Sequence, residues 1–206
     1  RDRLRSRGLG DVYKRQLKEQ SETNAYKMTN TLNQAFVDAV RGTGRYNAQR
    51  VLIVSGYWTN IDKTTSSRFQ MPEDMVNDRL MVSVHYVDNS MYWSNKIGGE
   101  EWLKYIDSQC AELKKAFLDN DIPVFMGETT STYTASNMAK DATHTDSSEC
   151  LSIVLGKLTE LGIVPVIWDT DSHFYSRTTY KIVNESDRKV IREYSDKLKA
   201  NLEAQQ

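Results

Sequence analysis

The sequence predicts an α/β fold in which a parallel sheet is flanked by helices. Four short apolar runs, rich in β-branched residues, alternate with segments in which apolar residues recur every three or four positions. Strands and helices that alternate in this way favour a parallel sheet with right-handed crossovers. Each apolar run also ends in polar or aromatic residues. In a (β/α)8 barrel the active site forms at the carboxyl ends of the strands, so these ends are the first place to look for function.

The first helix and the first two strands are predicted in residues 17–86. Apolar residues at helical spacing indicate the helix: Leu32, Phe36, Val37 and Val40. Gly42 and Gly44 follow and end it. Residues 50–58 contain a continuous apolar run, which predicts a strand that is buried on both faces. Residues 79–86 predict a second strand of the same kind.

The remaining elements follow in strict alternation. A helix over residues 99–120 carries one apolar stripe: Trp102, Leu103, Ile106, Cys110, Leu113 and Phe117. The third strand covers residues 122–128, with Pro123 near its start, where a missing N–H is tolerated. The next helix ends at Gly162 and has a leucine-rich inner face: Leu151, Val154, Leu155, Leu158 and Leu161. Residues 163–169 form the fourth strand. The last helix is built on Val190, Ile191, Tyr194, Leu198 and Leu202.

Composition excludes several classes of protein. The 206 residues contain 27 Lys and Arg against 28 Asp and Glu, a net charge of -1, which gives no basic field for nucleic acid or anionic lipid. No run of about 18 apolar residues is present to span a bilayer. Residues 1–16 hold six basic and two acidic residues, and we interpret them as a foreign or disordered head. The two cysteines, Cys110 and Cys150, are expected to be buried thiols.

Three other kinds of site are disfavoured by the residue pattern. No Gly-rich phosphate loop joins a strand to its helix, which argues against a dinucleotide fold. No GxSxG elbow supports Ser-His-Asp catalysis. His144, Asp146, Glu149 and Cys150 could be interpreted as a metal cluster, but their spacing is poor, and helix capping explains them better. We therefore predict no metal and no cofactor.

Three of the strand ends resemble one known family when they are taken together. They are Val84-His85-Tyr86, Phe125-Met126-Gly127-Glu128 and Val166-Ile167-Trp168-Asp169. In this order they resemble strands six, seven and eight of glycoside hydrolase family 5, whose members are retaining β-glycanases, chiefly cellulases. The resemblance implies a (β/α)8 TIM barrel, with residues 17–206 forming its C-terminal half, strands five to eight. It also implies a secreted enzyme that acts on β-glucan polysaccharide, either monomeric or part of a modular protein.

The resemblance assigns roles to individual residues. Glu128 matches the catalytic nucleophile, His85 matches the supporting histidine of strand six, and Trp168 matches the tryptophan that floors the cleavage subsite. Further candidates for sugar contact are Tyr86, Trp93, Trp58, Asp169 and His173. One position departs from the pattern: Val87 stands where the family usually has a tyrosine that contacts the nucleophile. Tyr86 and Tyr92 are the candidates to replace it.

The larger departure from the family's pattern is that no second catalytic carboxyl group is found at the expected place. Retaining hydrolysis needs two carboxyl groups about 5 to 5.5 Å apart, and the family keeps its acid/base in an Asn-Glu pair at the end of strand four. The Asn-Glu pair of this chain, Asn184-Glu185, follows the fourth predicted strand and is interpreted as a helix start. We therefore expect a truncated endo-β-1,4-glucanase that is inactive alone and that associates through its open sheet. The alternatives are a non-catalytic glucan-binding fragment, or a related mannanase, xyloglucanase or licheninase.

Overall fold

A computed structural model describes residues 21–169 and 174–204, and it confirms the predicted parallel sheet. Four strands lie in the order β1-β2-β3-β4, and each pair of neighbours is parallel. Their bounds are β1 Leu52–Ser55, β2 Leu80–His85, β3 Val124–Thr129 and β4 Val164–Ile167. Sequential strands that are parallel neighbours require a crossover between each pair, which the intervening helices supply. Within the described part of the chain, β1 and β4 are the two edges of this sheet.

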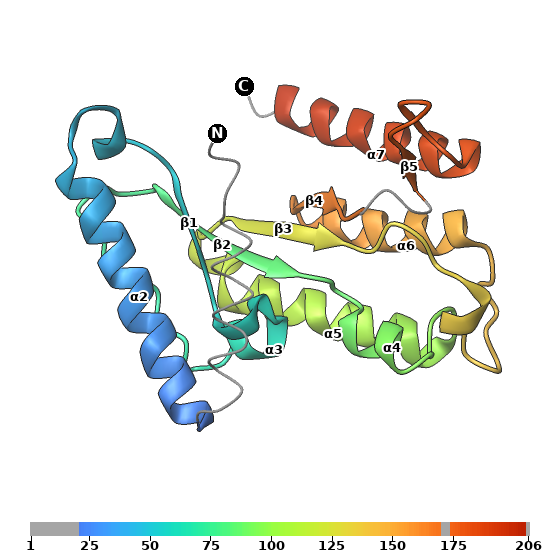
Figure 1. Cartoon of the computed structure of the whole chain (residues 1–206), viewed down its shortest axis with the longest axis horizontal. Helices are drawn as coiled ribbons and strands as arrows, with labels where there is room; N and C mark the ends of the chain where they lie inside the picture. The colour runs from blue at the N-terminus through green and yellow to red at the C-terminus, as the bar shows by residue number, and fades with distance from the viewer. Residues whose placement is uncertain (1–20, 170–173, 205–206) are drawn as a thin grey trace.

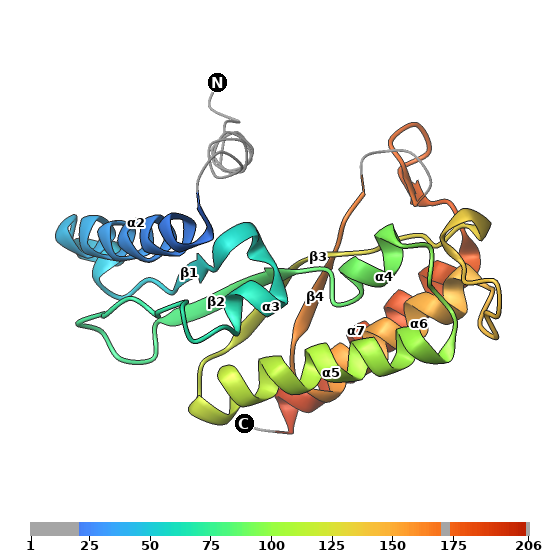
Figure 2. The same cartoon turned by 90° about the horizontal axis from the view of Figure 1, so that it is seen from below.

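The four long helices lie where the apolar periodicity predicted them. They are α2 Glu22–Gly42, α5 Glu100–Ala116, α6 Ser147–Glu160 and α7 Glu185–Glu203. Helix α2 lies at the β1 end of the molecule, whereas α6 and α7 lie at the β4 end (Figure 1). Helix α5 runs along the sheet beside α6 (Figure 2). The strands therefore stay flanked by helices along most of the sheet.

The sequence analysis did not foresee the short elements. These are α3 Ile61–Thr64, α4 Asn89–Trp93, the antiparallel hairpin of β5 Tyr175–Ser176 and β6 Lys181–Ile182, and four 3-10 turns: η1 Arg45–Ala48, η2 Tyr57–Thr59, η3 Leu118–Asn120 and η4 Ala135–Asn137. All of them lie in connections between the longer elements. Such short pieces lack the length that a hydrophobic period needs to become visible.

Side-chain caps explain where two of the helices begin. The Asp146 carboxylate accepts hydrogen bonds from the backbone N–H groups of Ser148 and Glu149, which starts α6. Asn184 accepts from the N–H of Ser186 and starts α7, so the interpretation of Asn184-Glu185 as a helix start is confirmed. Both caps satisfy N–H groups that have no partner inside the helix.

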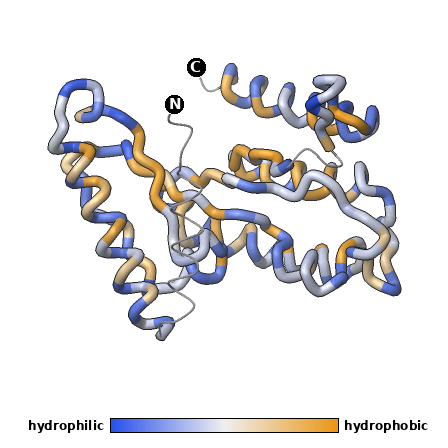
Figure 3. The backbone as a smooth tube through the Cα atoms, in the orientation of Figure 1, coloured by the Kyte–Doolittle hydropathy of each residue, from blue (hydrophilic) through white to orange (hydrophobic). Residues whose placement is uncertain are grey.

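One face of the sheet forms the core with the inner faces of α5 and α6. Val82, Val84 and Met126 are fully buried there, together with Trp102 of α5 and Leu158 of α6. The residues of β1 and α6 are mostly hydrophobic, whereas hydrophobic and hydrophilic residues alternate along α7 (Figure 3). Of the predicted helix faces, those of α5 and α6 are therefore confirmed as core.

Both cysteines belong to this core. Cys110 and Cys150 are buried, free thiols, as predicted. Burial raises the pKa of the Cys110 thiol to about 11 and that of Cys150 to about 12, because desolvation disfavours the thiolate. Both groups are therefore protonated and chemically quiet near neutral pH.

Two predictions of burial are wrong. The run at residues 50–58 predicted a strand buried on both faces, but β1 alternates: Leu52 and Val54 are buried, whereas Ile53 is 43% exposed. In α2 the predicted apolar residues Leu32 and Phe36 are also largely exposed. The face of α2 that is buried contains Ala25, Tyr26, Thr29, Val37 and Arg41. An apolar run alone does not show which of its faces another element covers.

Candidate active site

Glu128 lies near the carboxyl end of β3, beside His85 at the end of β2. The two residues are register partners, placed opposite each other by a register shift after Val84. Their side chains are each 21% exposed, so both are partly shielded yet open to solvent. A β-bulge of this kind redirects side chains and is common beside active sites. The register thus brings these two predicted site residues side by side at the carboxyl ends of β2 and β3.

Gly127 is the residue that lets the two strand ends come this close. A Cβ at this position would lie 2.9 Å from His85 Nε2 and 2.9 Å from Ser83 Oγ. Both separations are shorter than the contacts that real Cβ atoms show, so a larger residue would push the imidazole aside. Gly127 is therefore needed because any side chain at this position would clash with His85 and Ser83.

Tyr86 holds the Glu128 carboxylate from above the strand end. Its hydroxyl donates to Glu128 Oε2 at 2.6 Å, and its backbone N–H donates to the Glu128 carbonyl oxygen at 2.8 Å. The backbone of Tyr86 has a φ of 52°, in the left-handed region that few non-glycine residues adopt. Strained conformations of this kind persist where the surroundings impose them, and they cluster at functional sites.

The departure at Val87 is explained by this geometry. Val87 is buried in the core with 1% exposure, so its side chain points away from the carboxylate. Tyr86, one residue earlier, supplies the phenol that contacts Glu128 instead. His85 Nδ1 lies 3.6 Å from the same oxygen, Oε2. Within the described residues, Oε1 of Glu128 accepts no hydrogen bond.

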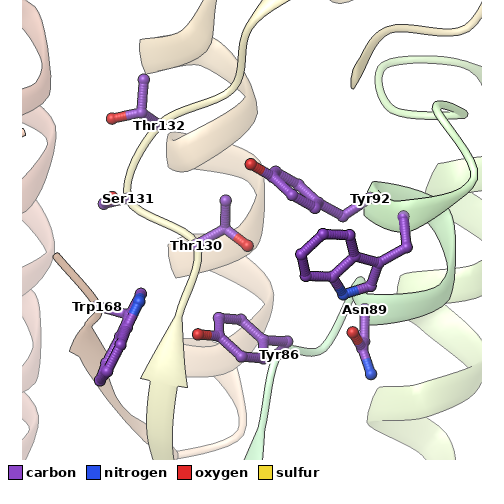
Figure 4. A pocket seen from close by; sticks show the side chains of 8 residues that line it. Tyr86, Asn89, Tyr92, Thr130, Ser131, Thr132 and Trp168 are labelled. Carbon is purple, nitrogen blue, oxygen red and sulfur yellow. The ribbon is translucent and has the colours of Figure 1, made fainter. Parts of the chain in front are cut away.

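An open pocket of about 170 Å³ lies next to these residues. Its walls come from the loops after β2 and β3 and from the end of β4: Tyr86, Asn89, Tyr92, Trp93, Thr130, Ser131, Thr132 and Trp168. Trp168 stands on one side and Tyr92 with Asn89 on the other, with Tyr86 and Thr130 between them (Figure 4). Aromatic faces beside small hydroxyl and amide groups suit a ligand that has both C–H faces and hydroxyl groups.

One hydroxyl in the pocket wall lacks a partner. Thr132 Oγ1 is buried and makes no hydrogen bond to any described residue. A buried hydroxyl without a partner costs free energy. Its oxygen points away from Tyr92 and Tyr86 (Figure 4), so this atom is covered by protein and is not a contact open to a ligand.

The structure brings together only some of the predicted site residues. Tyr86, Trp93 and Trp168 line the pocket, and Trp93 is largely exposed. Trp58 is not among the lining residues; its ring packs against Tyr57 at 4.9 Å between centroids, and its φ is 61°. Asp169 Oδ2 accepts the backbone N–H of Tyr175 at 3.0 Å and so supports the hairpin loop. His173 lies outside the described residues, as do residues 1–16.

The cluster near His144 is explained by helix capping. Asp146 caps α6, and His144 Nδ1 lies 2.7 Å from Glu149 Oε1 in the first turn of the same helix. Among residues 21–169 and 174–204, no group of three His, Cys, Asp or Glu residues is placed to hold a metal ion. No described helix is long and apolar enough to cross a membrane.

Comparison with known proteins identifies one family. The model of the cellulase family, glycosyl hydrolase family 5, matches residues 16–191. Endoglucanase B of Ruminococcus albus is 30% identical over 172 residues, which are 80% of this chain and 39% of that enzyme. A xyloglucan-specific endo-beta-1,4-glucanase of Bacteroides ovatus is 28% identical over 75% of this chain and 34% of its own length. The chain thus spans between about a third and two fifths of the length of these relatives.

The solved structures agree in fold. A broad-specificity endoglucanase from an uncultured bovine rumen ciliate superposes with a TM-score of 0.70 and 28% identity, covering 83% of this chain and 54% of that one. A lichenase from Caldicellulosiruptor sp. F32, solved with cellotetraose, gives a TM-score of 0.72 at 24% identity over 86% of this chain and 52% of its own. These likenesses, with the parallel sheet and its helices, support a fold of the (β/α)8-barrel type.

Proposed function

Since the chain belongs to the cellulase family, glycosyl hydrolase family 5, we propose that Glu128 is the nucleophile of a retaining endo-β-1,4-glucanase site. The observation that carries this proposal is the contact of Glu128 with Tyr86. The phenol of Tyr86, which also lines the aromatic pocket, holds Oε2 at 2.6 Å and leaves Oε1 without a hydrogen bond among the described residues. A carboxylate that is held by one oxygen presents the other in a constant direction, which is what attack on an anomeric carbon requires.

The proposed reaction passes through a covalent intermediate on this chain. Glu128 Oε1 bonds to the anomeric carbon while the bond from that carbon to the leaving glycosidic oxygen breaks. Water later attacks the same carbon and releases Glu128 as the carboxylate, so the anomeric configuration is retained. Tyr86 orients the carboxylate in both steps through its hydroxyl.

The acid/base that protonates the leaving oxygen is not assigned to any described residue. Glu185, from the Asn-Glu pair, begins α7 and forms an exposed ion pair with Arg188. General acid catalysis is worth about a hundredfold to ten-thousandfold. We therefore propose that this 206-residue chain carries the nucleophile half, strands five to eight, and releases no reducing sugar from unactivated glucan by itself.

Substrate contact is assigned to the pocket. Tyr86, Trp93 and Trp168 offer faces for pyranose C–H groups. Cellulose, mixed-linkage glucan, xyloglucan and mannan all present such faces, and β-1,4-glucan is our first choice. Polysaccharides of this kind are too large to enter a cell, so we propose that the parent enzyme is secreted.

An activated fluoroglycoside tests the nucleophile without an acid/base. In 2,4-dinitrophenyl 2-deoxy-2-fluoro-β-cellobioside the phenolate leaves unprotonated, and the fluorine slows release of the glycosyl ester. We expect the intact chain to gain the mass of one deoxyfluorocellobiosyl group and peptide mapping to place it on Glu128. A label on Asp169 or Glu149, or none, would overturn the assignment.

The second candidate function is glucan binding without chemistry. It is favoured by one observation, namely that the pocket is formed while no described residue is assigned as the acid/base. Calorimetry with cellotetraose separates the two candidates when it is run beside the labelling experiment. Binding without any label on Glu128 would favour the binding function.

A further inference from the structure

Asp88 is a buried neighbour of the aromatic pocket that contacts three residues through one carboxyl group. Its Oδ2 accepts hydrogen bonds from the Tyr133 hydroxyl at 2.7 Å and from Trp102 Nε1 at 3.4 Å. Its Oδ1 accepts from the Thr130 hydroxyl at 3.3 Å. Thr130 and Tyr133 belong to the loop after β3, and Trp102 belongs to α5. One side chain in the loop after β2 is therefore bonded to two other elements.

The position of Asp88 in the chain would suit a helix cap, but its side chain is not used as one. Asp88 directly precedes α4, where an aspartate commonly caps the first turn of a helix. In the described structure its carboxyl makes no cap bond, and only its backbone oxygen accepts from the helix, from Tyr92 N at 3.0 Å. The carboxyl is directed toward the loop after β3 instead.

The two loops that Asp88 joins form adjacent walls of the pocket. Tyr86 and Asn89, on either side of Asp88 in sequence, line the pocket, and so does its partner Thr130. The Tyr133 ring also packs edge-on against Tyr92, with 6.3 Å between centroids. A shift of the Asp88 carboxyl would thus change the distance between the walls that a sugar must fit.

Fold stability alone gives little reason for a carboxyl at this place. Asp88 is 1% exposed, and no Lys, Arg or His forms an ion pair with it in the described chain. Desolvation raises its pKa, and the three side-chain donors and its own backbone N–H oppose that effect. Apolar residues of similar volume often stabilise a core as well as buried charges do. The geometric role remains as the explanation.

We propose that Asp88 is a positioning residue for carbohydrate binding, which sets the spacing between the loops after β2 and β3. This inference rests on the proposed function, because it assumes that the pocket binds β-glucan. Asp88 itself is not expected to touch the sugar. Its effect passes through Thr130, Tyr133 and the residues that flank it in the loop.

Two variants of Asp88 and one control test this role. Asp88→Ala removes all three bonds, whereas Asp88→Asn can restore them: its amide oxygen accepts from Tyr133 and Trp102, and its NH2 donates to Thr130. Asp187→Ala is the matched control, since Asp187 is also buried and accepts from Ser148 at 2.6 Å, but it joins α6 to α7 and does not line the pocket.

The readouts are cellotetraose affinity and hydrogen exchange of the ligand-free protein. We expect Asp88→Ala to weaken affinity about tenfold or more, as the loss of hydrogen bonds to a charged group implies. Exchange should rise in residues 86–93 and 130–133 together. Asp88→Asn should bind within about threefold of the wild type. Asp187→Ala should keep the wild-type affinity even where it lowers stability.

The outcomes separate this inference from the proposed function. A wild-type chain that neither binds cellotetraose nor labels at Glu128 refutes both. Wild-type binding that survives unchanged in folded Asp88→Ala, or that falls equally in Asp187→Ala, refutes the positioning role alone. If Asp88→Ala does not fold, Tyr133→Phe replaces it, because it removes the 2.7 Å bond and keeps the ring. Unchanged affinity and exchange in that variant would also refute the role.

Discussion

The two faces of the four-stranded sheet have different contents and tolerate change differently. The face toward α5 and α6 presents Val82, Val84 and Met126, all fully buried in one hydrophobic core. The other face presents His85 and Glu128 at the strand ends. Farther down the strands it presents apolar residues that the described chain leaves exposed: Ile53, Val164 and Val166.

This difference shows how one sheet divides stability from chemistry. On the covered face many similar hydrophobic contacts add up, and volume matters more than the identity of one atom. On the open face single atoms decide, such as the Tyr86 hydroxyl on Glu128 Oε2. Substitutions on the covered face should therefore lower stability and leave the reaction of the folded molecules unchanged. Substitutions at the strand ends should slow the reaction and leave stability nearly unchanged.

The sharpest test of the open face is Glu128→Gln. The substitution keeps the shape and removes the negative charge that makes the carboxylate a nucleophile, so labelling by the activated fluoroglycoside should fall by about ten-thousandfold or more. Cellotetraose affinity and the thermal midpoint should stay near wild type. Glu149→Gln, at an exposed glutamate in the first turn of α6, is the control and should label normally. Near-normal labelling of Glu128→Gln would contradict the assignment.

The matching test of the covered face is Leu158→Ala. Leu158 is fully buried in α6, and truncation of such a leucine costs about 2 to 5 kcal/mol of unfolding free energy. Urea denaturation measures the loss, and labelling per folded molecule should not change. Val164→Ala, on the exposed face of β4, should cost less than about 0.5 kcal/mol. Equal costs for the two variants would show that the faces do not differ as described.

Gly127→Ala tests the boundary between the faces. The added Cβ would displace His85 from the nucleophile, since only 2.9 Å separates its position from Nε2. Misplacement of about 1 Å near a reacting group can cost about a hundredfold, so we expect labelling to slow by about tenfold to a hundredfold. Melting should change less than labelling, because the added Cβ meets side-chain atoms of His85 and Ser83 and no backbone atom within 4 Å among its nearest contacts. A labelling rate equal to that of the wild type would mean that His85 does not support Glu128.

Sequence reasoning reached the covered face more completely than the open one. The stripes of α5 and α6 follow from a period that repeats several times, as with Trp102, Ile106 and Leu113. The strand ends were also predictable, because apolar runs stop there and His85 and Glu128 follow. The sequence could not show that Tyr86 rather than Tyr92 contacts Glu128, since that depends on a register shift and a positive φ.

Other parts of the site had no sequence signal. Thr130, Ser131 and Thr132 line the pocket, yet threonine and serine after a strand are ordinary loop residues. Asp88 went unnoticed in the sequence, and only the structure shows that it is bonded to Tyr133. Trp58 followed a strand in the same way as Trp168, but a 3-10 turn places it against Tyr57. Strand ends thus indicate where a site lies, and loop geometry decides its members.

The ion pair between Arg41 of α2 and Asp74, in the loop before β2, can be tested by pH without changing the core or the site. Arg41 binds Asp74 in a bidentate ion pair, with Nε at 2.8 Å and Nη2 at 2.6 Å from the two carboxylate oxygens. The guanidinium lowers the pKa of Asp74 below its ordinary value, so the pair stabilises the fold above the unfolded-state pKa of about 3.9 and loses this effect as pH falls further.

Asp74→Asn should therefore have a lower thermal midpoint than the wild type at pH 7. The difference should shrink as the pH falls below about 4, where Asp74 becomes protonated in the unfolded chain and then in the folded one. Thermal melts at pH 7, 5 and 3 measure it. A difference that stays constant over this range would mean that the ion pair does not contribute through its charge.

The smallest effect on stability is expected from Val166→Lys, on the exposed side of the edge strand β4. Val166 is 39% exposed and shares a face with Val164, so a lysine there removes apolar surface and loses little packing. Charged residues on an edge strand oppose pairing with another sheet. The wild-type chain should self-associate with rising concentration in size-exclusion chromatography, and Val166→Lys should shift it toward the monomer. A sharp monomer peak of the wild type at all concentrations would show that the open face does not drive self-association. The two faces would then differ in chemistry alone.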